Sequence, residues 1–395
     1  MFNRRNFMSG MAAGLVGVKW GVRGFFDQVR YVMQSPPGAE TVFNGKRYLY
    51  FGGTGYYCLI HNPVMRKAAD EALEKYGMHP STSRGATGYG NMPLWMDVEK
   101  KTAEYYGVED SFYIPSGYLS NVAGYQALDS IYKIDAVFVD EDSHYSVIDF
   151  IPVIGKPVYT FAHRDPEDLK KKLQQQLKPG QTPLVVSDGV FPTFAGLAPL
   201  PAYLEVTEPY GGYIWLDDSH GVGVLGPNGR GTADHFGVKS DRVFFGGTFS
   251  KAFGSHGAHI PGNGKFIQAL HDGHVAHGAT PSPSPAAASA IVAMDLLRNH
   301  PEMKAQLWKN AKMMKSGLRQ LGFNLQDTPH PVTAWVLKTE EEMDRIQQEL
   351  FKRGIAIQRL HYAGSGSLGA LRVVVFSTHT PEQINRLLDE LKKVV

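Results

Sequence analysis

The sequence predicts an α/β protein, with a large domain built on a mostly parallel sheet and a small α+β domain after it. Short apolar runs alternate with segments of helical pattern up to about residue 280. Strands that are apolar on both faces and separated by helix-length spacers are typical of a parallel sheet covered on both sides. The expected strands are 111–115, 135–140, 183–188, 212–217 and 242–247, with helical spacers at 166–177 and 200–211.

A proline-rich segment, TPSPSP (280–285), separates the large domain from a region of different pattern. There, Thr339 and Glu342 predict a capping box, and Thr380 with Pro381 predicts the start of the last helix. We expect helices at 286–298, 303–320, 340–352 and from 381, and strands at 331–338, 354–358 and 371–376. The chain therefore divides into an N-terminal arm (1–45), a large domain (46–285) and a small C-terminal domain (286–395).

The composition of the chain argues against several classes of function and structure. The 40 lysines and arginines nearly balance the 38 acidic residues, which gives no electrostatic basis for binding nucleic acid. The single cysteine, Cys58, excludes an internal disulfide framework. His271, His274 and His277 recur at helical spacing, but without the carboxylates that would complete a metal site, so we expect no metal. No apolar run is long enough for an ordinary transmembrane helix.

The first residues resemble a twin-arginine export signal over 1–22, because Arg4 and Arg5 precede an apolar, glycine-rich run. That run is short, and no small-x-small cleavage site lies between it and Arg23. We therefore expect an N-terminal arm that continues as a helix, in a cytoplasmic protein. Export, or membrane contact through this segment alone, is the alternative.

A lysine follows one of the predicted strands in GGTFSKAFGSHGAH (246–259). A lysine amine forms a Schiff base with an aldehyde, and pyridoxal phosphate (PLP) is the common aldehyde cofactor. The hydroxyls of Thr248 and Ser250 and the neighbouring glycine amides could bind its phosphate. The pattern around Lys251 is also compatible with a surface lysine when taken alone.

An acidic residue ends another predicted strand, in WLDDSHGVGVLGPNGRG (215–231). PLP acts as an electron sink when a carboxylate keeps its pyridine nitrogen protonated, and the buried acid Asp217 requires such a partner. His220 is close enough in sequence to reach the phenolic oxygen of the ring. A turn or a helix cap would also explain two consecutive aspartates, but not the five glycines that follow.

Two further segments follow strand ends. Ser116, Gly117 and Tyr118 open a helix, and the N–H groups at a helix N-terminus bind phosphate. His144 follows the strand at 135–140, where its imidazole could stack on a planar ring or simply be a hydrogen-bonded loop histidine. In open α/β sheets ligands bind beyond the carboxyl ends of the strands. Taken together, these segments predict a PLP site.

The chain resembles the α-oxoamine synthase family of fold-type-I PLP-dependent transferases from about Thr41 to the C-terminus. The motifs that carry the resemblance are DDSHGVGVLGPNGRG (217–231), TFSKAFG (248–254), SGYLSN (116–121), DSHYSV (142–147) and SDGVF…APLP (187–201). The resemblance implies that Lys251 binds PLP and moves protons at the substrate Cα, while Asp217 pairs with the pyridine nitrogen. It further implies that His220 bonds the phenolic oxygen and that His144 stacks on the ring.

The resemblance also implies a homodimer with a shared active site. Thr248 and the backbone amides of Gly117 and Tyr118 would hold the phosphate, and Thr280 would reach the phosphate of the neighbouring subunit. Arg372 would bind the carboxylate of the amino acid, a task that suits a bidentate guanidinium.

The implied reaction joins an amino acid to an acyl thioester, either acyl-CoA or an acyl-carrier protein, and releases CO₂ to give an α-amino ketone. Thr54, which we expect on the substrate side, stands where the family has an asparagine, Trp95 where it has a histidine, and Pro192 where it has a serine. These departures leave open another PLP reaction, such as aldol-type cleavage, racemisation or transamination. A PLP-binding protein without turnover is a third possibility.

Overall fold

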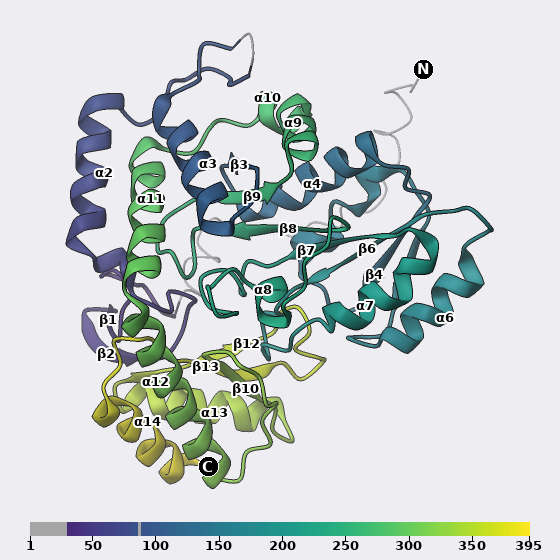
Figure 1. Cartoon of the computed structure of the whole chain (residues 1–395). Coiled ribbons are helices and arrows are strands. Elements are labelled where there is room, and N and C mark those ends of the chain that lie inside the picture. The colour runs from purple at the N-terminus through teal and green to yellow at the C-terminus, as the bar shows by residue number, and fades with distance from the viewer. Residues whose placement is uncertain (1–29, 86–87) are drawn as a thin grey trace, which may run out of the picture.

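The computed structural model describes residues 30–85 and 88–395 (Figure 1). The twin-arginine-like segment at 1–22 lies outside these residues. A seven-stranded sheet crosses the middle of the molecule, and the C-terminal elements form a smaller unit below it in Figure 1. Within the described ranges, no helix is both long and apolar enough to cross a membrane.

The large sheet is mostly parallel, as predicted. Its strands are β3 (Asp110–Ile114), β4 (Ala136–Asp140), β5 (Val158–Phe161), β6 (Pro183–Asp188), β7 (Tyr213–Asp217), β8 (Val243–Thr248) and β9 (Ala258–Gly262). They lie in the order β3-β9-β8-β7-β6-β4-β5. The run from β5 through β4, β6 and β7 to β8 is parallel, and β9 is antiparallel to both of its neighbours.

Sequence reasoning missed β5 and β9. Strand β5 is an edge strand with partly exposed side chains, so it lacks the apolar run that marks the inner strands. Strand β9 contains Pro261, which argues against a central strand. Its pairing with β8 covers only Ala258 and His259, so Pro261 lies past the end of that ladder. The sheet therefore accepts a proline that the sequence pattern treats as a break.

Helices cover both faces of this sheet, which explains why its inner strands are apolar throughout. Alternate residues point to opposite faces of a strand. Leu184 and Val186 of β6 pack in the core beneath α4 (Gly117–Ile131) and α9 (Gly264–Asp272), whereas Val185 packs beneath α6 (Pro166–Gln176) and α7 (Leu200–Thr207). The predicted helix at 200–211 ends at Thr207 and continues as a short 3-10 turn, η3 (Glu208–Tyr210).

Three helices form a separate layer at one side of the large sheet. Helix α11 (Ser284–Asn299) packs against α2 (Pro63–Tyr76) and α3 (Pro93–Tyr106). The sequence-based division placed α11 in the small domain. Its apolar residues pack in a core that contains residues of α2 and α3 and also residues of the small domain. The remaining short helices are η1 (Leu59–His61), α5 (Tyr145–Ile148), η2 (Ile151–Ile154), α8 (Thr232–Phe236) and α10 (His274–Gly278).

The described part of the N-terminal arm, residues 30–45, contains no helix, so that expectation is wrong there. Instead β1 (Glu40–Phe43) and β2 (Lys46–Tyr50) form a hairpin. The turn residues Asn44 and Gly45 have φ angles of 49° and 78°, the positive values that a tight hairpin turn needs. Strand β2 also pairs with β11 (Ile355–Ala356), so residues 46–50 join the C-terminal elements rather than the large sheet.

The small domain has a second sheet in the order β10-β13-β12. Its elements are β10 (Val332–Trp335), β12 (Gln358–Leu360), β13 (Ala370–Val374), α12 (Pro301–Gln320), α13 (Glu340–Lys352) and α14 (Pro381–Val394). The full capping box lies at Thr380 with Gln383. At Thr339 only half of the predicted box is present, because Thr339 accepts the N–H of Glu342 without a return bond.

Candidate active site

A cavity of about 160 Å³ lies at the carboxyl ends of β6, β7 and β8. Every residue predicted to hold or act on the cofactor lines it except Thr280. The lining residues are Ser116, Gly117, Tyr118, His144, Ser146, Asp188, Asp217, Ser219, His220, Thr248, Ser250 and Lys251. The sheet brings these residues together because neighbouring parallel strands end at the same edge.

Asp217 is buried at the end of β7 with a full set of donors. Its Oδ2 accepts hydrogen bonds from Asn121 Nδ2 at 2.9 Å and Ser146 Oγ at 3.1 Å, and its Oδ1 accepts the N–H of Ser219 at 3.1 Å. These donors fix the position of the carboxylate at the edge of the cavity. Asn121 and Ser146 were not singled out from the sequence, although both lie in segments that were.

Asp188 is a second buried carboxyl in the cavity and was missed by sequence reasoning. It ends β6 directly beside Asp217 in the sheet register. Burial, and then repulsion from Asp217, raises the pKa of Asp188 well above its ordinary value, while the N–H of His144 donates to its Oδ2 at 2.7 Å. The signal was available, because Asp188 ends an apolar strand just as Asp217 does.

Lys251 lies in the turn after β8 and is partly buried. Burial lowers the pKa of its amine, and the carboxylates of Asp217 and Asp188 act in the opposite direction. A lysine with a lowered pKa has a larger neutral fraction at physiological pH, which is the form that attacks an aldehyde or accepts a proton. Lys251 therefore lines the cavity with an amine whose lowered pKa suits Schiff-base formation.

His220 is a neutral side chain in the wall of the cavity. Burial, and then the positive charge of Lys251, lowers its pKa well below the ordinary histidine value. Its Nδ1 lies 2.8 Å from the hydroxyl of the buried Tyr56, and its carbonyl oxygen lies 3.1 Å from Nε2 of His330. The ring is held at Nδ1, which leaves its Nε2 for a partner in the cavity.

His144 caps α5 and forms the opposite wall. Its Nδ1 lies 2.7 Å from Ser146 Oγ, and its Nε2 lies 2.6 Å from the hydroxyl of Tyr362. Burial lowers its pKa, so the ring is neutral at pH 7 and suited to stacking. His144 has hydrogen-bond partners on both ring nitrogens, as a structural loop histidine would, yet it also lines the cavity.

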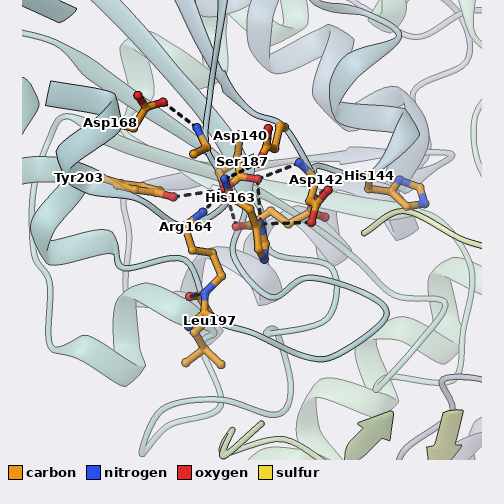
Figure 2. Close-up of polar contacts among 12 residues, drawn as sticks. Asp140, Asp142, His144, His163, Arg164, Asp168, Ser187, Leu197 and Tyr203 are labelled. Atoms are coloured by element: carbon orange, nitrogen blue, oxygen red, sulfur yellow. Dashed lines mark hydrogen bonds and ion pairs between the residues drawn. The ribbon is translucent and has the colours of Figure 1, made fainter. Parts of the chain in front are cut away.

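A polar cluster around Asp140 holds the loop that carries His144 (Figure 2). Asp140 is buried at the end of β4 and accepts N–H groups of Asp142 at 3.0 Å and Arg164 at 2.8 Å. It also accepts from His163 Nδ1 at 3.0 Å and from the hydroxyl of Tyr203 at 3.3 Å. Figure 2 shows His144 beside Asp142, so this cluster fixes the backbone just before the cavity wall.

The end of the cavity next to α4 fits a phosphate. Ser116 caps the helix and accepts the N–H of Tyr118 at 3.1 Å, while the hydroxyls of Thr248 and Ser250 lie 2.8 Å apart. A Cβ added to Gly117 would come within 3.2 Å of Thr248 Cβ, so only glycine leaves this space open. With an amine, a carboxylate, a neutral imidazole and a helix N-terminus, the donor set fits PLP.

The glycine run after Asp217 has a packing cause. The neighbouring Asp218 is buried and accepts hydrogen bonds from the N–H and hydroxyl of Thr232 at 2.6 and 2.7 Å. A Cβ on Gly221 or Gly231 would come within 2.1 or 2.0 Å of the Asp218 carboxylate. These glycines therefore wrap a buried acid behind the cavity. Burial raises the pKa of Asp218 to about 7.

Arg372 is a buried cation on β13. Its Nη1 donates to the carbonyl of Gly53 at 3.3 Å and to Gln358 Oε1 at 2.5 Å, and its Nε is buried without a partner. No acidic side chain in the described ranges forms an ion pair with it. It lies near enough to lower the pKa of Lys251 and His220. Thr54 follows Gly53 and is half-buried.

Three other predicted positions lie elsewhere. Thr280 is exposed in the loop between α10 and α11 and does not line the cavity. Trp95 is fully buried in the core, with the guanidinium of Arg84 at 5.4 Å from its ring centroid. Pro192 is buried in a turn after β6. In the described part of the chain, no group of three potential ligands could hold a metal ion.

The family described as "Aminotransferase class I and II" matches residues 53–391. The chain belongs to the class I and II aminotransferase family. That range contains both the cavity and Arg372, so the family match includes the whole candidate site.

Within this family, the similar proteins are α-oxoamine synthases, the group that the sequence motifs indicated. The chain is 33% identical to the 8-amino-7-oxononanoate synthase of Alkaliphilus metalliredigens over 92% of this chain and 91% of the relative. It is equally similar to that of Thermosipho melanesiensis, over 94% of each. Among solved structures, the serine palmitoyltransferase of S. paucimobilis with a bound PLP–myriocin aldimine has a TM-score of 0.86 and 28% identity, covering 92% of each chain. These similarities confirm the fold-type-I transferase fold.

Proposed function

We propose that this protein is a PLP-dependent acyltransferase that condenses an amino acid with an acyl thioester, releases CO₂ and forms an α-amino ketone. The observation that carries the proposal is that a lysine with a lowered pKa lies within the electrostatic influence of a buried arginine that has no acidic partner among the described residues. Lys251 supplies the amine, Asp217 the carboxylate, and Arg372 the cation that awaits a substrate carboxylate. The relatives named 8-amino-7-oxononanoate synthase and serine palmitoyltransferase support this reaction class.

When bound, PLP supplies an electron sink for negative charge at the substrate Cα. The chain's own groups then orient and move protons. The amine of Lys251, with its lowered pKa, holds the cofactor and accepts the Cα proton. Asp217, whose carboxylate is held in place by three hydrogen-bond donors, pairs with the pyridine nitrogen of the cofactor.

Two residues orient the reactants. Arg372 binds the carboxylate of the amino acid, which relieves the cost of a buried guanidinium without an anion. His144, neutral and fixed by hydrogen bonds at both ring nitrogens, supports one face of the cofactor ring. Thr54, next to the carbonyl that contacts Arg372, borders the same region and is the position where amino-acid selectivity would change.

We further propose that the active enzyme is a homodimer with shared sites. Thr280 is exposed and outside the cavity of its own chain, which fits a residue that serves a second copy. The segment before it has few buried side chains, as expected of a surface that a partner would cover.

The test is release of free thiol from a panel of acyl-CoAs, with glycine, alanine and serine each offered as amino donor. We expect thiol release that requires both partners and disappears in Lys251→Ala, which should also lose the PLP absorbance. If no acyl-CoA of the panel releases thiol while the amino acids still change the PLP spectrum, an acyl-carrier donor or another PLP reaction would be favoured. Retained turnover in Lys251→Ala would contradict the proposal outright.

We propose a cytoplasmic location, since the segment at 1–22 lacks a clear cleavage site. Fractionation of producing cells, followed by intact-mass analysis, tests this. Full-length protein in the cytosolic fraction is expected, and protein shortened near residue 22 in the periplasm would contradict it.

A further inference from the structure

Tyr362 reaches from the small domain to the wall of the cofactor cavity. It lies in the loop between β12 and β13, and its hydroxyl is 2.6 Å from Nε2 of His144. Its ring centroid lies 5.4 Å from that of His144 and 5.6 Å from that of Tyr145. A side chain of the C-terminal domain therefore contacts the histidine that faces the cofactor.

The loop is held in this place by its own bonds. Tyr362 and Ser365 exchange two hydrogen bonds of 2.9 Å, in which the N–H of Tyr362 donates to Ser365 Oγ and the N–H of Ser365 donates to the Tyr362 carbonyl. The hydroxyl of Thr193, in the large domain, donates to the carbonyl of Ala363 at 2.7 Å. The contact between Tyr362 and His144 is thus part of a docked loop and not an isolated meeting of two surface side chains.

The contact also continues a chain of hydrogen bonds that runs inward. From Tyr362 it passes to His144, whose Nδ1 accepts the N–H of Ser146 at 3.1 Å, and the hydroxyl of Ser146 in turn donates to the carboxylate of Asp217 at 3.1 Å. Burial, together with nearby Tyr145, raises the pKa of Tyr362, so its hydroxyl keeps its proton at neutral pH. The inner end of the chain is fixed by the sheet, and the outer end depends on Tyr362.

We propose that Tyr362 is a positioning residue that holds the imidazole of His144 in its orientation against the cofactor and so links the small domain to the reacting centre. The inference rests on the proposed function, because His144 matters for catalysis only where the cavity holds PLP. Outer partners that orient a functional histidine commonly contribute 10-fold or more to activity, by analogy with the partners of metal-bound histidines. We therefore expect a catalytic effect of about that size.

The experiment compares Tyr362→Phe with Tyr145→Phe. Tyr145 is a matched control, because its ring also packs beside His144 while its hydroxyl has no hydrogen bond within the described chain. Tyr362 is 41% exposed, so loss of one hydroxyl leaves the fold intact. The first readout is the ring NMR signal of His144 in cofactor-free protein with labelled histidine, assigned by its absence in His144→Asn. The second is the split between kcat and KM in the PLP-loaded enzyme.

We expect the His144 signal to move in Tyr362→Phe and to stay in place in Tyr145→Phe. In the loaded enzyme, kcat should fall about 10-fold in Tyr362→Phe alone, with KM for the amino acid within about 2-fold of the parent. An unmoved signal, an equal shift in both variants, or a kcat equal to that of the parent would overturn the inference. The NMR readout needs neither cofactor nor substrate, so a failure to detect acyl transfer would count against the proposed function and leave this test intact.

Discussion

At the scale of single residues, the site combines groups that are costly in the folded protein. Arg372 is a buried cation without an anion among the described residues, and Asp188 and Asp217 are two carboxyls side by side at the ends of neighbouring strands. Burying such groups is unfavourable unless a ligand or a partner compensates them. Their surroundings therefore indicate where ligand charge is expected, and two predictions follow from the individual side chains Arg372 and Asp218.

Arg372→Lys should raise KM for the amino acid. A lysine keeps the charge but loses the planar fork that bonds both carboxylate oxygens, and a hydrogen bond to a charged group is worth about 1.5–3 kcal/mol. Steady-state kinetics should therefore show a KM increase of about 10- to 100-fold. Arg353→Lys is the control, since that arginine pairs with Glu390 at the surface and should leave KM unchanged. A parental KM in Arg372→Lys would refute the role of the guanidinium.

Asp218 should make the protein less stable as pH rises. Its pKa is raised to about 7 in the folded state, above the ordinary aspartate value, so the folded protein binds more protons than the unfolded chain between these values. The contribution of Asp218 to stability is full at low pH and falls through that window, with a slope of up to about 1.4 kcal/mol per pH unit. Asp218→Asn keeps the shape of the side chain and removes the titration.

The measurement is thermal unfolding of cofactor-free protein between pH 5 and pH 8. The decline of Tm with pH should be shallower in Asp218→Asn than in the parent. Parallel curves would show that Asp218 does not titrate in this range. Asp188 also has a raised pKa, so the variant is expected to retain part of the slope.

Sequence reasoning found the residues of the site that end strands in conspicuous motifs, such as Asp217 and Lys251. It missed Asp188, which ends an apolar strand in the same way but is not followed by a glycine-rich segment like that at 221–231. The contact of Tyr362 with His144 had no local signal, because the two residues lie on different domains. Hydrogen bonds between side chains that lie far apart in the sequence can be identified only in the folded structure.

At the scale of elements, the placement of α4 depends on close contact with β7. A Cβ added to Gly124 would lie 2.1 Å from Trp215 Cη2, so a side chain there must push the helix away from the sheet. The same helix presents its N-terminus to the cavity through Gly117. Packing at the middle of α4 therefore sets the position of its N-terminal end, which is proposed to bind the phosphate.

Gly124→Ala should destabilise the protein by about 1–3 kcal/mol, the usual cost of overpacking a core. It should also weaken PLP binding, because the helix start moves. Chemical denaturation and PLP titration measure the two effects. Gly278→Ala, at the end of α10 where a new Cβ meets nothing within 4 Å in its own chain, is the control for stability and should leave the free energy of unfolding unchanged. Unchanged stability in Gly124→Ala would show that Trp215 of β7 can move to accommodate the added methyl group.

The elements that could be predicted are those with one dominant pattern. Strands β4, β6, β7 and β8 are apolar on both faces because helices cover both sides of the sheet, and their bounds agree with the sequence to within a residue or two. Strand β9 was hidden by Pro261, and the hairpin β1–β2 by its polar residues. Both are stabilised by pairing with distant strands, which no local pattern reports.

At the scale of the whole molecule, the proposed dimer predicts a role for Thr280 that the single chain cannot explain. Thr280→Ala should weaken PLP binding about 10-fold, the loss of about 1.4 kcal/mol for one hydrogen bond to a charged group. Because Thr280 is exposed, Tm of the cofactor-free protein should stay the same. Sedimentation should give twice the mass of one chain for the parent.

Thr160→Ala provides the control, since Thr160 is exposed on the edge strand β5, far along the sheet from β8. It should leave PLP affinity unchanged. Two results together would rule out the shared site: a parent protein that sediments with the mass of one chain, and a Thr280→Ala variant that binds PLP with the affinity of the parent.

The pairing of β2 with β11 also sets an order of events during synthesis. The hairpin β1–β2 leaves the ribosome early, but the strand that completes its sheet follows only when most of the chain has been made. Contacts between segments so far apart form late, because the loop between them must first be closed. The strands of the large sheet are translated in the interval, whereas Arg372 comes after β11. A nascent chain therefore contains Lys251, the lysine proposed to bind the cofactor, well before Arg372, the arginine proposed to bind the substrate carboxylate. If both roles hold, selection among amino acids begins only with the finished protein.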